Sequence, residues 1–192
     1  MLAAQQLARL GDGQLAYRLF QQAEAKDSQA FADVKALHDY ARAASIASNG
    51  PDAVRLYRLL ISRVTLLDDP RERVFAQIEA AAHVLAYVDK GADEALGYLT
   101  RARQKPLGLS PWIAVLRVLA MQRSGRGSGA GALASARTLA SLGAPPPAQF
   151  NAEFPLLPAG LFAALGAAVR ERPETAAPVR PVLKGSGKDK SR

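Results

Sequence analysis

Apolar side chains in the first 142 residues recur at intervals of three and four positions along the chain. Three stretches show the pattern most clearly, with apolar residues at Phe31, Val34, Leu37, Ala41 and Ala44, at Val74, Ile78, Ala81, Ala82, Leu85 and Val88, and at Trp112, Leu116, Leu119 and Ala120. This spacing places the apolar side chains on one face of an α-helix, whereas a strand would show alternation. The pattern therefore predicts an all-α fold.

Residues that favour turns separate the predicted helices. Gly, Pro, Asn and Asp gather at 11–13, 49–51, 68–70, 90–91, 106–111 and 125–131. Such residues mark the ends of helices and the loops between them. The breaks predict eight helices of roughly 10–20 residues, arranged as four antiparallel pairs. Paired acids at Asp68–Asp69 and Asp93–Glu94 fall at predicted helix starts, where carboxylates bind the exposed backbone N–H groups.

One arrangement of small and large residues returns at a nearly constant period. The second helix of each predicted pair carries an Ala in the same place, at Ala16, Ala53, Ala95 and Ala132, with separations of 37, 42 and 37 residues. A period of this length with two helices per unit is typical of an α-solenoid. One hairpin cannot cover its own apolar face, so neighbouring hairpins must cover the rest.

The residues that follow each Ala resemble the second helix of the tetratricopeptide repeat family. The matching triplets are Ala16-Phe20-Ala23, Ala95-Leu99-Ala102, Ala53-Tyr57-Leu60 at two of three positions, and a weaker Ala132-Ala136-Leu139. The resemblance covers residues 1–143 and implies a right-handed solenoid of about four hairpins. The units exceed the family's usual length of about 34 residues, and its Leu-Gly pair is missing. A HEAT-like solenoid of helical hairpins therefore stays an alternative.

In tetratricopeptide repeats the first helices line a concave groove that binds a partner, and the resemblance implies such a groove here. The family's groove positions fall on Lys35, His38, Arg42, Gln77, Val84, Tyr87, Arg117 and Met121. Cations beside apolar residues suit an acidic or carboxylate-ended peptide. The resemblance therefore implies a non-catalytic scaffold that binds a protein or peptide, as part of a larger assembly. The family's carboxylate-clamp asparagines have no counterpart, which argues against a receptor for chaperone tails.

The chain changes character after Gly143. Residues 144–158 are rich in proline and predict an extended connector. Residues 159–172 predict one more helix, whose apolar face would cap the last hairpin. Residues 173–192 have too little apolar content to order themselves, so a disordered basic tail is expected there. The terminal repeat is thus predicted to have its exposed side covered by a helix of the same chain.

The net charge of +8 is unevenly distributed. Residues 1–94 carry 11 Lys/Arg against 13 Asp/Glu, whereas residues 95–152 carry seven Lys/Arg and no acid. The candidate basic patch consists of Arg101, Arg103, Lys105, Arg123 and Arg126. A charge asymmetry of this kind is a hint of an anionic partner. Binding of nucleic acid or an anionic surface through residues 95–137 and the tail is therefore the alternative function.

Catalytic chemistry finds little support in the sequence. The chain has no Cys, which excludes disulfides, thiolate metal sites and cysteine nucleophiles. His38 and His83 lack the companion residues of a helical metal site. His83 falls where the family has a small packing residue, so an interface histidine is expected. The Gly-rich residues 124–131 lack the Lys-Ser/Thr pair of a phosphate loop. We therefore expect no enzyme, no metal and no cofactor.

The sequence also predicts neither a membrane span nor a signal peptide. The longest apolar-leaning run, at residues 154–169, contains two prolines and is shorter than the roughly 20 residues that cross a bilayer. A soluble protein is expected, in the cytoplasm, or in the periplasm if an N-terminal signal was removed. Leu2, Leu7 and Leu10 at the N-terminal end would allow a homo-oligomer if their face is uncovered.

Overall fold

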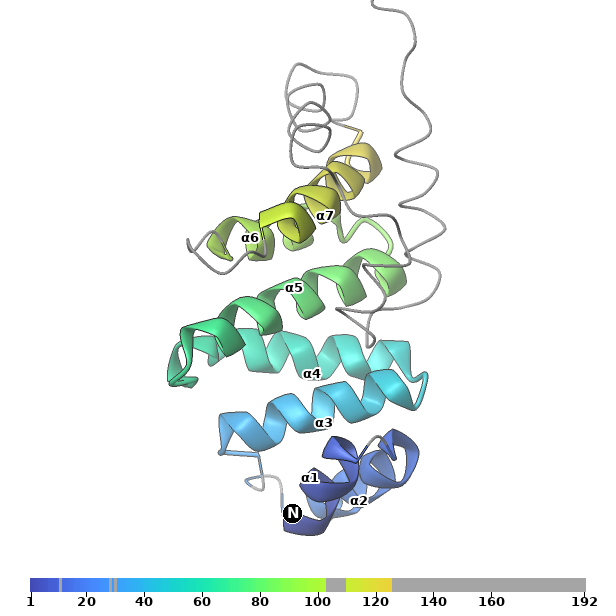
Figure 1. Cartoon of the computed structure of the whole chain (residues 1–192). Coiled ribbons are helices and arrows are strands. Elements are labelled where there is room, and N and C mark those ends of the chain that lie inside the picture. Colours follow the sequence, from blue (N-terminus) through green and yellow to red (C-terminus); the bar gives the residue numbers. More distant parts are fainter. Residues whose placement is uncertain (11, 28, 30, 103–109, 126–192) are drawn as a thin grey trace, which may run out of the picture.

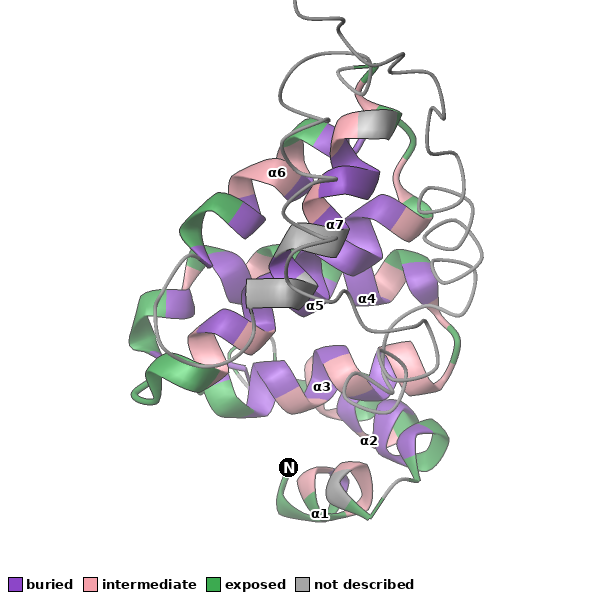
Figure 2. Cartoon of the chain, turned by 45° about the horizontal axis from the view of Figure 1, so that its top comes forward, coloured by how far each residue is buried: buried purple, intermediate pink, exposed green. Residues whose placement is uncertain are grey.

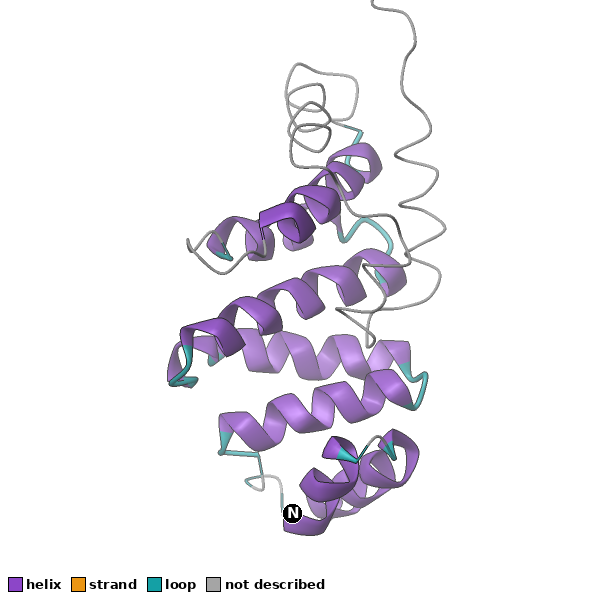
Figure 3. Cartoon of the chain, viewed as in Figure 1, coloured by secondary structure: helices purple, strands orange, loops and turns teal. Residues whose placement is uncertain are grey.

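The computed structural model describes residues 1–125 except for residues 11, 28, 30 and 103–109. The described residues form seven α-helices and one short 3-10 helix, and none of them forms a strand (Figures 1 and 3). The elements are α1 (Leu2–Arg9), α2 (Gly13–Lys26), α3 (Val34–Ile46), α4 (Gly50–Ser62), η1 (Val64–Leu66), α5 (Pro70–Tyr87), α6 (Ala92–Arg101) and α7 (Ser110–Arg123). The prediction of an all-α fold is confirmed for these residues.

Several predictions concern residues outside the described part of the chain. They are the eighth helix, the unit that begins at Ala132, the connector, the capping helix and the basic tail. The predicted breaks at 49–51, 68–70 and 90–91 fall at helix boundaries, because α4 begins at Gly50, α5 at Pro70 and α6 at Ala92.

The helices pack on one another in the order in which they occur in the sequence. Each helix from α1 to α7 contacts the next one, and α1 also contacts α3 while α5 contacts α7. Figure 1 shows the stack rising from α1 and α2 at one end to α7 at the other. Most partners are therefore close in sequence, and every inner helix has neighbours on at least two sides.

Short polar side chains begin four of these helices. Their carboxylate or amide oxygens accept hydrogen bonds from backbone N–H groups two or three residues later, and the four residues are Asp12, Asp33, Asn49 and Asp69. These bonds satisfy N–H groups that have no partner within the helix. The prediction of a cap is confirmed for Asp69. In α6, Asp93 and Glu94 lie in the first turn and the N-cap residue is Gly91.

The residues that carry the sequence repeat lie in the core. Ala16, Ala53 and Ala95 have no exposed surface, and the large residues four positions later, Phe20, Tyr57 and Leu99, are equally buried. Figure 2 shows buried residues throughout α2 to α7, whereas most described residues of α1 are exposed or intermediate. An Ala side chain lets a neighbouring helix approach closely, and the large residue then fills the space beside it. The repeat is therefore a packing unit.

Two residues with left-handed backbone conformation occupy equivalent places after α3 and α5. Ser48 has φ 58° and Lys90 has φ 61°, and each precedes the buried Ala of the following helix by five positions. The N–H of Asn49 donates to the carbonyl oxygen of Ala44, as in a Schellman turn. Glycine is the residue that adopts this conformation without strain. Both turns thus use a conformation that their side chains disfavour.

The first residue of α2 is a glycine for a reason of space. A Cβ placed on Gly13 would overlap Cβ and Cγ2 of Ile46, the last residue of α3. Gly50, the first residue of α4, has the same relation to the ring of Tyr87 at the end of α5. Both α2 and α4 therefore begin with a residue that leaves room for the end of the helix that follows.

Substituting Gly13 by Ala should reduce the free energy of unfolding by about 1–3 kcal/mol, because Ile46 or the α2 backbone must move. The matched control is Gly97→Ala within α6, where the nearest atom to the new Cβ is Nη2 of Arg101 at 3.9 Å. Ala is a better helix former than Gly, so the control should gain up to about 1 kcal/mol. Urea denaturation measures both changes. Equal changes in the two variants would contradict the packing role of Gly13.

Substituting Lys90 by Gly should raise the free energy of unfolding by about 0.5–1 kcal/mol, because the left-handed strain disappears. Lys90→Ala removes the same long side chain but keeps the Cβ, so it should bring no such gain. Thermal and urea unfolding of the two variants distinguish these outcomes. A gain in both would mean that the lysine side chain, rather than the backbone conformation, is unfavourable.

Candidate functional site

A buried ionic cluster joins three helices in the middle of the stack. Glu79 of α5 is 4% exposed, and its carboxylate lies 2.9 Å from Nε2 of His38 and 3.0 Å from Nη2 of Arg42, both on α3. Nε of Arg42 also donates to both carboxylate oxygens at 3.3 Å, and the Tyr57 hydroxyl of α4 donates at 3.1 Å. We call these four residues the Glu79 cluster.

The surroundings of Glu79 keep its carboxylate ionised. Burial alone raises the pKa of the carboxyl group, but the charge of Arg42 and the hydrogen bond from His38 outweigh it and hold the pKa at about 2. Burial and the nearby charge of Glu79 raise the pKa of Tyr57 well above its ordinary value, so the phenol remains a neutral donor. The cluster therefore contains a stable Glu–Arg ion pair with hydrogen-bond donors around it.

His83, one turn after Glu79, belongs to a second set of buried hydrogen bonds. Its Nδ1 lies 2.7 Å from the backbone carbonyl oxygen of Glu79, and its Nε2 lies 2.8 Å from Oγ of Ser45. A carbonyl oxygen only accepts, so Nδ1 carries the hydrogen and Nε2 of the neutral ring accepts from the serine hydroxyl. Burial lowers the pKa of His83, which favours this neutral form. The histidine thus connects α3 and α5, as an interface histidine does.

Three of the predicted groove residues lie inside the protein. His38, Gln77 and Val84 are buried, with 4%, 8% and 0% exposure. For Gln77 and Val84 the reason is the position of α5, which packs against α4, α6 and α7, so that nearly every residue from 74 to 85 is buried. Assigning one exposed face to this helix by sequence register is therefore not sufficient. His38 lies on α3 and is buried where its ring contacts Glu79.

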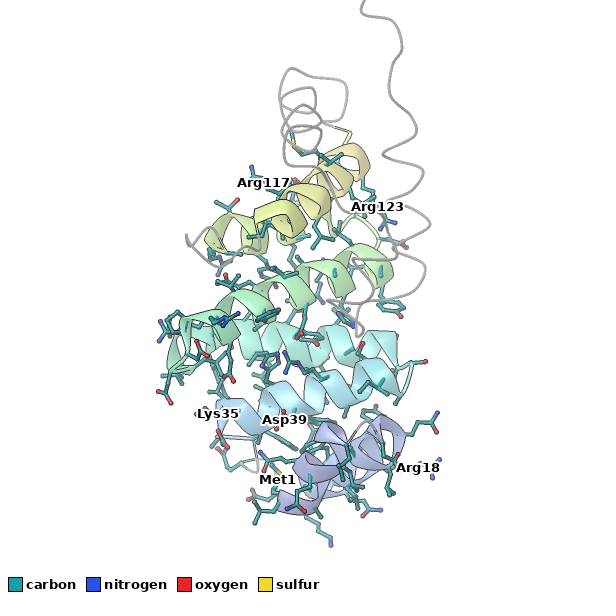
Figure 4. All side chains as sticks on the ribbon, in the orientation of Figure 1. Met1, Arg18, Lys35, Asp39, Arg117 and Arg123 are labelled. Atoms are coloured by element: carbon teal, nitrogen blue, oxygen red, sulfur yellow. The ribbon has the colours of Figure 1, made fainter. Side chains whose placement is uncertain are left out.

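The other predicted groove residues reach the surface to different extents. Lys35 is exposed and pairs with Asp68 at 3.4 Å, while the side chain of Arg42 is 33% exposed above Glu79. Tyr87 is 47% exposed, and Arg117 and Met121 on α7 are partly exposed. In Figure 4 Lys35 lies on α3, and Arg117 lies on α7 towards the other end of the stack.

The basic patch is described only in part. Arg101 is exposed, with its guanidinium 5.6 Å from the ring centroid of Tyr98. Arg123 donates from Nη1 to the backbone carbonyl oxygen of Leu85, so this cation takes part in packing α7 on α5. Arg103, Lys105 and Arg126 lie outside the described residues. The structure thus brings no cluster of these cations together within the part it describes.

The N-terminal end exposes several large apolar side chains. Leu2 is 78% exposed and Leu10 is 82% exposed, whereas Leu7 packs partly against the core. Met1 and Leu15, at 42% and 43%, belong to the same end. The predicted homo-oligomer would use this surface, and it stays a prediction.

The described residues contain no group of three or more His, Cys, Asp or Glu side chains placed to hold a metal ion. Among the described helices, none has both the length and the apolar character of a membrane span. Sequence reasoning missed Glu79 and Tyr57 as members of a buried cluster. The available signal was an acidic residue within the apolar run of α5, where the sequence reads Ile78-Glu79-Ala80.

Comparison of the chain with models of known families, with curated proteins and with solved structures gave no match. The described residues form a stack of helices with a buried ionic cluster between α3, α4 and α5.

Acid should lower the free energy of unfolding through this cluster. The pKa of Glu79 in the folded state is about 2, below its ordinary 4.5, so its contribution to stability is complete above pH 4.5 and is lost as the pH falls towards 2. The lowered pKa of His83 acts in the same direction, beginning below pH 6.5. Urea unfolding at a series of pH values measures both.

The variant Glu79→Gln should lose roughly 3 kcal/mol at pH 7, because it leaves Arg42 without its counter-ion. It should also show a flatter pH dependence between 4.5 and 2 than the natural protein. The control Glu94→Gln breaks the partly exposed pair with Arg58 and should lose less than about 1 kcal/mol. Similar losses in both variants would contradict the special role of the buried carboxylate.

Proposed function

We propose that the chain is a right-handed solenoid of tetratricopeptide-like helix hairpins that acts as a non-catalytic scaffold. Its partner is a protein or a peptide bound along the first helices of the hairpins, α1, α3, α5 and α7. Four hairpins and a terminal capping helix complete the proposed architecture. The packing of each helix on the next, together with the contacts of α1 with α3 and of α5 with α7, supports such a stack.

Regularities in the described hairpins support the repeat. Ala53 and Ala95 are fully buried, and each follows a left-handed turn residue by five positions. Gly13 and Gly50 each leave space for the last residue of the following first helix. These features occur at equivalent positions in successive units. They are what repeated stacking of one hairpin type requires, because each unit contacts mainly its neighbours.

The single observation that carries the proposed binding function is that the guanidinium of Arg42 is fixed in position and still partly exposed. Glu79 fixes its guanidinium through Nε and Nη2, while a third of the side chain remains exposed. A cation that is held in place loses less conformational entropy when it binds a partner. Lys35 and Arg117 add positive charge on the same set of helices, which suits an acidic or carboxylate-ended peptide. Tyr87 adds an exposed aromatic ring of the kind that is enriched in protein interfaces.

Capture of binding partners from an extract of the source organism tests this proposal. The bait is the full chain, natural or with Lys35→Glu and Tyr87→Ala, which change two exposed residues of the predicted groove. A protein partner that is retained at high salt and lost in this variant is the expected result, because apolar contacts resist screening whereas phosphate contacts do not.

The matched control carries Arg18→Glu on α2 and Leu66→Ala on η1, both at exposed positions. It changes the charge by the same amount and also removes an exposed apolar side chain. Equal loss of the partner in both variants would place the binding surface elsewhere. Capture dominated by nucleic acid that washes away with salt would favour the alternative function of the basic half.

A further inference from the structure

A hollow of about 480 Å³ opens beside the second helices of the first two hairpins. Its lining comes from α2, α3 and α4 and includes Tyr17, Gln21, Glu24, Tyr40, Asp52 and Arg55. It shares no residue with the predicted groove. The lining combines two tyrosines with three charged side chains.

The charged groups of the hollow are held in fixed positions. Nη1 and Nη2 of Arg55 bind the two oxygens of Glu24 at 2.9 and 3.0 Å, and Nε binds Asp52 at 2.5 Å. The hydroxyl of Tyr40 donates to Glu24 at 2.9 Å, and that of Tyr17 donates to Asp52 at 2.8 Å. Residues from three helices thus orient both carboxylates without any contribution from a ligand.

The hollow carries a net negative charge. Burial and the hydrogen bond to Asp52 raise the pKa of Tyr17 to about 12, and burial and Glu24 raise the pKa of Tyr40 still further. Both phenols therefore remain neutral donors at physiological pH. Two carboxylates against the one guanidinium of Arg55 leave one negative charge in excess.

The carboxylates retain acceptor capacity. A carboxylate offers about four lone-pair sites. The bonds from Arg55 and the two tyrosines occupy three sites at Glu24 and two at Asp52. The rings of Tyr17 and Tyr40 are buried, with 8% and 0% exposure, so their hydroxyl groups rather than their faces belong to the site. A positively charged hydrogen-bond donor is the group that matches all of these features.

We propose that this hollow is a docking site for a basic side chain of a partner protein, with arginine as the preferred residue. The guanidinium of an arginine can donate hydrogen bonds to Glu24 or Asp52 from several N–H groups in a fixed planar arrangement. The openness of the site favours a side chain over a free small molecule. The side chains of Glu24 and Arg55 are 34% and 48% exposed, whereas sites for free ligands enclose about 70–90% of the ligand surface.

An NMR titration of the full chain tests the proposal with the peptide acetyl-Gly-Arg-Gly-amide. The control peptide contains citrulline, which has nearly the shape of arginine but no charge. The arginine peptide should shift resonances of Tyr17, Tyr40 and Asp52 with a roughly millimolar dissociation constant, and the citrulline peptide should bind at least about tenfold more weakly. Equal binding of both peptides, or no shifts with either, would overturn the proposal.

Three variants of the chain test whether the charges of the hollow determine the affinity for the arginine peptide. Asp52→Asn removes a negative charge from the hollow and should weaken binding of the arginine peptide. Arg55→Gln removes the internal cation and should strengthen it, which a merely damaged fold would not do. Glu94→Gln removes a carboxylate that pairs with Arg58 outside the hollow and should leave the affinity unchanged. Weakening by Arg55→Gln, with circular dichroism unchanged, would overturn the assignment of the hollow to a cation.

Discussion

The buried negative charge of Glu79 is the constraint on which the packing of the central helices depends. An ionised carboxylate inside a protein is highly unfavourable unless charged and polar groups surround it. His38 and Arg42 approach from α3, and Tyr57 approaches from α4. These side chains reach the carboxylate together only when the three helices have one relative position. Apolar packing stabilises the stack in general, whereas the Glu79 cluster selects one arrangement of its helices.

Polar contacts on the outside of the same helices contribute less to stability. Arg55 joins Glu24 across α2 and α4, and Arg58 joins Glu94 across α4 and α6. Both arginines are nearly half exposed, so water and salt screen these pairs and each contributes little to stability. Their geometry is nevertheless well defined. Beside Arg55 it creates a hollow with oriented carboxylates, so contacts of modest energy can still shape a site for recognition.

Local features of the chain account for most of what could be predicted about the fold. The helices and their ends follow from apolar spacing and from turn residues, which act over a few positions. The buried places of Ala16, Ala53 and Ala95 follow from the repeat. The candidate site was harder to predict, because α5 has neighbours on several sides and its register does not show which residues stay exposed. Gln77 and Val84 on α5 therefore proved to be buried, and His38 on α3 is buried where it contacts Glu79.

The sequence by itself determined that the described part of this chain is helical, where its helices break and which small residues recur in the core. These properties depend on contacts within one turn or one hairpin. Only the tertiary structure decided that Glu79 meets His38 and Tyr57, which are 41 and 22 residues away, and that Gly13 makes room for Ile46. Such contacts depend on how far one helix slides and turns against the next. The sequence pattern of a single helix does not determine this relative position.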